Sequence, residues 1–111
     1  MGVAKRDIEF VRGDDYGHTI QFQDEACVPF SIVGNTYRSQ IRKVFSQVDP
    51  SAEFATSTVN AANGELVLTL DHTITKTLLS GDYWWDLEEI DAGVITTLIG
   101  GRCRVLADVT R

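Results

Sequence analysis

The sequence predicts an all-β fold, an antiparallel immunoglobulin-like β-sandwich with about seven to eight strands. Apolar and polar residues alternate with a period of two, and turn signals recur about every ten residues. The chain has 111 residues, which is the size of one domain. Hydrophobic residues make up 43% and charged residues 23%, enough apolar material for one core. We therefore expect a single ordered domain over residues 1–111.

Two strands are expected before residue 24. Ile8 and Phe10 alternate with polar neighbours until residues 12–15 break the run. The alternation resumes over residues 16–23. We expect the first strand, residues 7–11, to lie at the edge of a sheet, where it is able to exchange between subunits.

The next expected strand covers residues 37–45. It follows a short segment in which Pro29 excludes a central strand, because proline cannot donate to the ladder. Alternation along this strand separates an inward from an outward face. The expected inward set is Tyr37, Ser39, Ile41, Lys43 and Phe45, and the outward set is Arg38, Gln40 and Arg42.

The middle of the chain predicts two further strands and a helical turn. Residues 53–59 are rich in β-favouring side chains, and Asn63-Gly64 predicts a type I′ hairpin turn into the strand 65–70. A single helical turn is expected near Thr73–Leu79, capped by Asp71 or Thr73.

A hairpin is expected at the C-terminal end of the chain. The strand 82–90 is followed by a tight turn at 91–93 and by a returning strand that runs to residue 109. Gly100-Gly101 indicates a bulge or a switch between sheets within the returning strand. The expected core positions are Phe22, Ile41, Phe54, Leu66, Leu68, Tyr83, Trp85, Leu87, Val105 and Val109.

The charge of the chain argues against nucleic acid as a partner. The formal net charge is −6, which gives no general attraction for phosphate backbones. Arg38, Arg42 and Lys43 come closest to a basic patch, but their place in a strand favours a solvated sheet face. Apolar runs are too short for a membrane span or a signal peptide, so no membrane partner is expected.

Candidate catalytic and metal-binding groups are few. Cys27 and Cys103 lie far apart without metal-ligand spacing, so we expect two buried thiols without a disulfide. His18 and His72 show no sign of a shared site, and no catalytic or cofactor-binding fingerprint is present. The acidic residues between 82 and 91 are spread along a strand, which suits solvation better than calcium binding. We expect no catalytic residues, no metal and no cofactor.

Arg12-Gly13-Asp14 is interpreted as a turn between strands and not as an adhesion motif.

Two outward positions are the best candidates for contact with a partner. Trp84 is expected to point outward, where an indole either anchors a partner or stacks on a sugar. Arg38 lies on an outward strand face, and arginine is also enriched at interfaces.

Several segments of the chain, in their order and spacing, resemble small virion proteins of tailed phages and prophages. The pattern is similar to the immunoglobulin-like β-sandwich domain of tail-collar and upper-baseplate proteins that anchor fibres. The match runs from about Arg12 to Arg111. The segments are Arg12-Gly13-Asp14, residues 37–42, residues 64–70, Thr75 with residues 78–87, and Asp108-Val109-Thr110-Arg111.

The resemblance implies a non-enzymatic virion structural protein, a tail-collar or baseplate adaptor that anchors tail fibres. It implies tail, baseplate or fibre subunits as partners and a homo-oligomer on a symmetric particle. The protein would be assembled in the host cytoplasm and reside in the virion. Two alternatives stay open: a capsid-decoration or head–tail joining protein, and a sugar-binding module that uses the Trp84 face.

Overall fold

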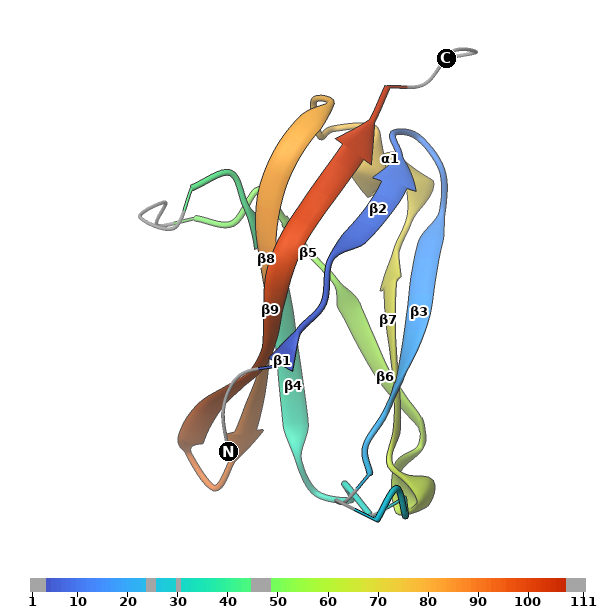
Figure 1. Cartoon of the computed structure of the whole chain (residues 1–111), viewed down its shortest axis with the longest axis vertical. Helices are drawn as coiled ribbons and strands as arrows, with labels where there is room; N and C mark the ends of the chain where they lie inside the picture. Colours follow the sequence, from blue (N-terminus) through green and yellow to red (C-terminus); the bar gives the residue numbers. More distant parts are fainter. Residues whose placement is uncertain (1–3, 24–25, 30, 45–48, 108–111) are drawn as a thin grey trace.

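Two β-sheets face each other across one hydrophobic core (Figure 1). The computed structural model describes residues 4–23, 26–29, 31–44 and 49–107, with only the backbone of Ala4 and Val59. The molecule measures 42 × 28 × 23 Å. The predicted all-β fold class is confirmed, and no helix in the described part of the chain is long and apolar enough to span a bilayer.

The larger sheet has the strand order β1-β9-β8-β4-β5, with β2 also paired to β9. The smaller sheet has the order β3-β7-β6. The larger sheet consists of β1 (Ala4–Lys5), β2 (Ile8–Val11), β4 (Thr36–Arg42), β5 (Ala52–Glu53), β8 (Gly81–Asp91) and β9 (Val94–Leu106). The smaller sheet consists of β3 (Tyr16–Gln21), β6 (Ala55–Asn60) and β7 (Glu65–Leu70).

The number of strands exceeds the predicted seven to eight because one expected strand divides in two and a further short strand, β1, precedes the expected first strand. The run predicted at 53–59 divides at Phe54, so that β5 belongs to the larger sheet and β6 to the smaller one. Phe54 is 3% exposed, and its N–H donates to the Ser39 carbonyl at 2.8 Å. The chain therefore crosses between the sheets at a buried aromatic side chain that anchors both.

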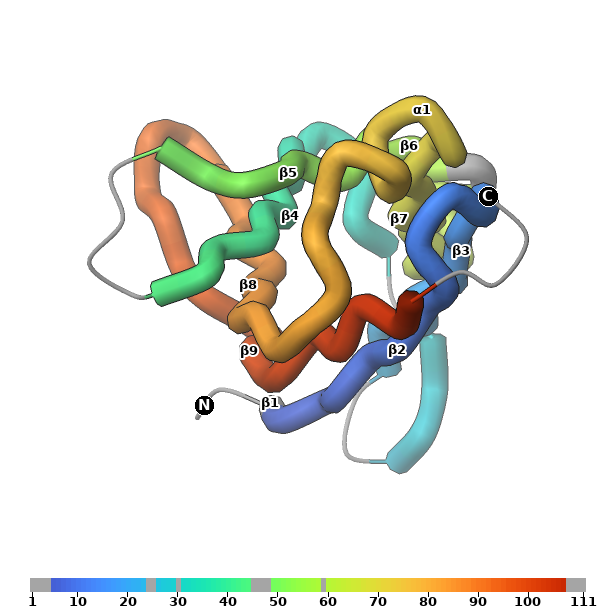
Figure 2. Tube along the Cα trace, turned by 90° about the horizontal axis from the view of Figure 1, so that it is seen from above, coloured from blue at the N-terminus to red at the C-terminus, as the bar shows by residue number. Residues whose placement is uncertain are grey.

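The N-terminal strand departs from the predicted antiparallel pairing. It lies at a sheet edge, as expected, but both β1 and β2 run parallel to β9 (Figures 1 and 2). Ala4 pairs with Ile99 and Ile8 pairs with Cys103, so the two short strands share one register. The ladder is interrupted at Arg6, whose carbonyl accepts a hydrogen bond of 2.7 Å from Trp85 Nε1.

The two glycines of β9 neither interrupt the strand nor switch it to the other sheet, because β9 continues from Val94 to Leu106. The predicted bulge lies close to them: Leu87 pairs with Ile99 and Glu88 with Thr97, so Leu98 is the extra residue of β9. A Cβ atom on Gly101 would overlap the Arg6 carbonyl oxygen and lie 2.7 Å from the carbonyl carbon. Glycine is required here because the N-terminal backbone passes directly against β9.

Gly101→Ala is expected to lower the free energy of unfolding by about 2 kcal/mol. The added methyl group would clash with the backbone of Arg6, which cannot turn aside as a flexible side chain does. Urea denaturation measures this loss. Hydrogen exchange should show faster exchange of the Arg6 amide, which donates to the Gly100 carbonyl at 3.2 Å. Gly34→Ala is the control, because a Cβ atom on Gly34 would meet no other atom within 4 Å. The only strain expected in that variant comes from the backbone φ of 89° at residue 34 itself. Unchanged exchange at Arg6 would contradict the close approach.

Two predicted turns take a different form. Asn63-Gly64 does not form a type I′ turn; the 3-10 turn η1 (Ala61–Asn63) ends at Gly64, whose φ is 72°. The helical turn α1 (His72–Thr75) is shorter than the predicted Thr73–Leu79 and is capped by Asp71, which accepts from the Thr73 N–H. Ala92 and Gly93 have φ of 52° and 83°, which forms the tight turn expected between β8 and β9.

The predicted core is confirmed with few exceptions. Phe22 is only partly buried, Lys43 is exposed beyond the end of β4, and Phe45 and Val109 lie outside the described residues. The Lys43 ammonium lies 4.6 Å from the centroid of the Tyr83 ring. The buried predicted positions are Ile41, Phe54, Leu66, Leu68, Tyr83, Trp85, Leu87 and Val105.

Candidate functional site

The face of the larger sheet that points away from the core, here called the outward face, carries three rows of cross-strand neighbours. Side chains directly opposite each other on adjacent strands lie close together on the same face. The rows follow from the pairing of β4, β8 and β9. They are Arg38–Glu88–Thr97, Gln40–Asp86–Gly100 and Arg42–Trp84–Arg102.

A groove of about 620 Å³ lies over these rows, and we call it the Trp84 groove. Gly100, which stands opposite Asp86, has no side chain, and this leaves the hollow open between the rows of Trp84 and Thr97. Its volume falls within the range of small-ligand sites. The lining consists of Lys5, Arg42 and Arg102, of Asp7 and Asp86, and of Gln40, Trp84, Trp85, Thr97, Gly100 and Gly101.

Trp84 faces outward and is partly buried, whereas Trp85 is 3% exposed and lies in the core. The predicted orientation of both side chains is therefore confirmed. The Arg102 guanidinium carbon lies 5.4 Å from the centroid of the Trp84 ring, in a cation–π contact. The Arg102 backbone N–H donates to Asp7 Oδ1 at 3.0 Å, which ties the N-terminal segment to this wall of the groove.

Arg38 lies on the same outward face but outside the Trp84 groove. Its Nε and Nη2 atoms donate to Glu88 Oε1 at 3.0 and 2.8 Å. This hydrogen bond raises the pKa of Arg38. The charge of Arg38, which belongs to the predicted basic patch, is thus offset by Glu88. Lys43 of the same patch donates a hydrogen bond to the Asp82 carbonyl at 3.1 Å. Nothing in this arrangement adds to the case for nucleic acid.

Asp86 is the carboxylate in the middle row. Its Oδ1 atom is screened from solvent and has no hydrogen-bond partner. Burial, together with the charge of Glu88, raises the pKa of Asp86, while Arg42 and the Gln40 backbone N–H lower it. The groove therefore holds an acceptor that is desolvated and only partly satisfied.

The other acidic residues between 82 and 91 are engaged separately. Glu89 Oε2 accepts from the Tyr37 hydroxyl at 2.8 Å, and burial of that hydroxyl raises the pKa of Tyr37. Asp82 lies 3.6 Å from Arg104 Nε. Glu89 and Asp82 thus have separate partners on different strands.

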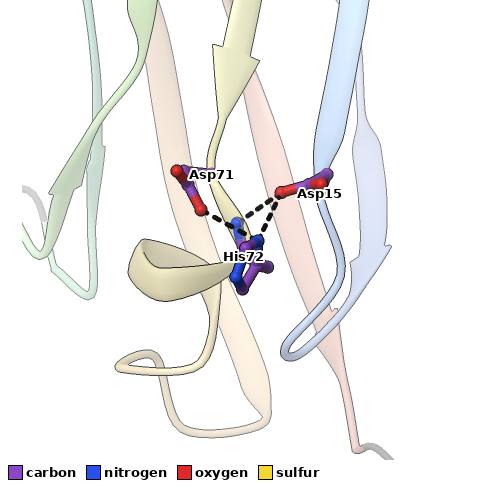
Figure 3. Close-up of side chains that lie close together, drawn as sticks. All are labelled: Asp15, Asp71 and His72. Carbon is purple, nitrogen blue, oxygen red and sulfur yellow. Dashed lines mark hydrogen bonds and ion pairs between the residues drawn. The ribbon is translucent and has the colours of Figure 1, made fainter.

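A group of exposed metal-ligating side chains lies elsewhere, where β3 begins and β7 ends (Figure 3). Asp15 Oδ1 accepts from the His72 backbone N–H at 2.7 Å and lies 3.0 Å from His72 Nδ1. The backbone hydrogen bond lowers the pKa of Asp15. Asp71 Oδ1 also lies 3.0 Å from His72 Nδ1. Both carboxylates already accept from backbone N–H groups, so the cluster fastens β3 to the start of α1.

His18 lies on the inward side of β3, away from His72. Its ring centroid is 5.5 to 6.1 Å from those of Tyr16, Phe54 and Trp85, and neither ring nitrogen has a hydrogen-bond partner. Burial, with a smaller contribution from Arg6, lowers the pKa of His18 to about 4. The two histidines do not share a site, as predicted, and His18 lies among aromatic rings.

The two cysteines differ from each other. Cys103 is fully buried, and burial raises its pKa to about 12. Cys27 is exposed, with a φ of 61°, so the prediction of two buried thiols is wrong for this residue. Residues 26–29 form a turn and an isolated bridge between Gln23 and Pro29, which leaves the Cys27 side chain outside the core. The two thiols form no disulfide.

The Arg12-Gly13-Asp14 turn is held from inside the molecule. The N–H of Gly13 donates to Thr75 Oγ1 at 3.0 Å, and Thr75 Oγ1 donates to the Asp14 carbonyl at 2.8 Å. Arg12 Nε donates to the Leu78 carbonyl at 2.8 Å. Gly13 is buried with a φ of 89°, so this tripeptide is a structural turn and not a displayed loop.

Comparison with known proteins does not identify the chain. No protein family matches it, and no curated protein sequence matches it. Among solved structures, 95% of the chain is similar to part of a 2,6-sialyltransferase from Vibrionaceae Photobacterium sp. JT-ISH-224, determined with CMP and lactose. The identity is 13%, the TM-score is 0.35, and the chain spans 18% of that enzyme's length. A likeness this slight carries no argument about activity or substrate.

Proposed function

We propose that this chain is a non-enzymatic structural protein of a tailed-phage virion, a tail-collar or baseplate adaptor that anchors tail fibres. The observation that carries the proposal is the order and spacing of the segments that resemble such proteins. Two of these segments contact each other, because the Arg12-Gly13-Asp14 turn bonds to Thr75 and to Leu78. The resemblance thus rests on residues that hold one end of the sandwich together.

The strand edges support an assembly role. β3 and β6 form the two edges of the smaller sheet, and Thr56, Ser57 and Thr58 of β6 are exposed and uncharged. An edge strand offers backbone groups with which a strand of another subunit pairs. Repeated copies on a symmetric particle gain avidity from contacts that are weak individually.

The outward face supplies the side chains that we propose as partner contacts. Trp84 and Arg38 lie on adjacent strands of this face, with Arg42 beside Trp84 in the same row. Aromatic and arginine side chains contribute most of the energy in many interfaces. A tail, baseplate or fibre subunit is the proposed partner for this face.

Stoichiometric incorporation into particles tests the proposal. Quantitative mass spectrometry of gradient-purified virions should find this chain at a constant ratio to the major tail protein in independent preparations. Absence of the chain from purified particles would refute the virion role. A constant ratio to the major capsid protein in tail-less heads would instead favour the alternative, capsid decoration or head–tail joining.

A further inference from the structure

The Trp84 groove combines apolar and charged surface in a way that restricts its ligand. The Trp84 indole and the glycine backbone at 100–101 supply apolar surface. Three cations and two carboxylates line the same groove, together with the Gln40 amide and the Thr97 hydroxyl. Lysine and arginine side chains only donate hydrogen bonds, and ionised aspartates only accept them. The groove therefore offers both kinds of partner to a ligand.

This mixture disfavours three classes of ligand. A cationic ligand would approach Lys5, Arg42 and Arg102, and an anionic ligand would approach Asp7 and Asp86. A purely apolar ligand would take these charged groups out of water without giving them hydrogen bonds. A neutral molecule with many hydroxyl groups avoids all three costs, since each hydroxyl donates one hydrogen bond and accepts others.

We propose that the Trp84 groove binds a neutral saccharide, with one pyranose ring packed against Trp84 and hydroxyl groups bonded to Asp86 and Arg102. A pyranose has a flat face of C–H groups that packs on an aromatic ring, and its hydroxyl groups project from the rim. The Arg102 guanidinium over the indole fixes the ring in place before the ligand arrives. A saccharide would take the place of a partner subunit at Trp84, so this inference is an alternative to the subunit contact proposed there and does not depend on the virion role.

Asp86 supplies an independent reason for a hydroxyl-bearing ligand. Its Oδ1 atom has no hydrogen-bond partner although it is withdrawn from water, and such an acceptor lowers the stability of the empty groove. Asp86 lines the hollow beside Gly100, where a ligand hydroxyl would donate a hydrogen bond to this carboxylate. Such a bond would offset part of the cost of the desolvated acceptor.

Nuclear magnetic resonance titration tests the proposal on the intact chain. The probes are methyl glycosides of glucose, galactose, mannose and N-acetylglucosamine, with glucuronate and sulfate as charged comparisons. The indole N–H signals of the two tryptophans report separately. Trp84 should shift saturably with at least one neutral glycoside, and by more than Trp85, which also lines the groove but is 3% exposed and has its N–H bonded to the Arg6 carbonyl.

Two matched substitutions locate the binding in the groove. Arg102→Gln should weaken the binding of the responding glycoside about tenfold. Arg104→Gln changes the same residue type on the same face of β9, two positions further along and outside the groove, and should change the affinity less than twofold. Asp86→Asn, which preserves shape, should also weaken binding about tenfold.

Several results would overturn the proposal. The first is no Trp84 shift with any neutral glycoside up to tens of millimolar. The second is a shift with glucuronate or sulfate alone, which would make the groove an anion site. The third is an equal effect of Arg102→Gln and Arg104→Gln, which would place binding elsewhere on the face.

Discussion

Trp85→Ala is expected to lower the free energy of unfolding by about 4 kcal/mol, a large fraction of the stability of a domain this size. Trp85 is 3% exposed, and its ring packs between His18 and Phe54 at centroid distances of 5.7 and 6.0 Å. Truncation leaves a cavity between the sheets and removes the donor to the Arg6 carbonyl. Urea denaturation followed by far-ultraviolet circular dichroism measures the loss.

Two further variants separate the causes of this loss. Trp85→Phe keeps an aromatic ring in the core but removes the N–H group, so a loss of about 1 to 2 kcal/mol is expected. Trp84→Ala truncates the outward indole and should cost about 1 kcal/mol, mostly from the contact with Arg102. A Trp85→Ala variant no less stable than Trp84→Ala would mean that the wrong tryptophan has been placed in the core.

Acidification is expected to destabilise the protein through His18. Burial lowers the pKa of His18 from 6.5 to about 4, and this residue is neutral in both states above pH 6.5. Between pH 6.5 and 4 the unfolded chain binds a proton that the folded chain excludes, so folding becomes less favourable as the pH falls. This one residue should lower the free energy of unfolding by about 3 kcal/mol between neutral pH and pH 4.

The comparison with His18→Phe isolates this contribution from that of the carboxylates. The variant keeps a ring against Tyr16, Phe54 and Trp85 and removes two ring nitrogens that lack partners. Its stability should fall by about 3 kcal/mol less over the same pH range. His18→Leu gives the same pH test if the larger ring packs poorly. Identical pH dependence in the wild type and both variants would contradict the burial of His18.

Strand periodicity was sufficient to predict the faces of the long strands. The alternation around Ile41, around Leu66 and Leu68, and around Trp85 placed these residues inward, where each is at most 3% exposed. Asp71, one of the two residues predicted as the helix cap, is the cap in the structure. These features depend on residues close together in the sequence, which is where local patterns are informative.

Features that depend on distant partners could not be predicted in this way. The parallel pairing of β2 with β9 joins residues that lie 95 positions apart, as in Ile8 and Cys103, and no local signal encodes the direction of such a pair. The pair Gly100-Gly101 did mark a special place, but the reason is the approach of Arg6 and not a bulge. His18 continues the period of β3, but its burial depends on Phe54 and Trp85, which are distant in the sequence.

The candidate site was predicted only in part. The outward orientation of Trp84 followed from alternation, but the groove needs Lys5 and Asp7 from the N-terminal segment and Arg102 from β9. Adjacent glycines within a strand can indicate close approach of a backbone or a ligand, and they were the available signal. The convergence of these segments became visible only with the strand order of the larger sheet.

The most direct test of the proposed virion role is immunogold electron microscopy of purified phage particles with an antibody against this chain. A tail-collar or baseplate adaptor predicts label confined to the tail, at its neck-proximal or distal end, with a constant number of sites per particle. Label spread over the capsid, or particles that carry no label, would contradict the proposal.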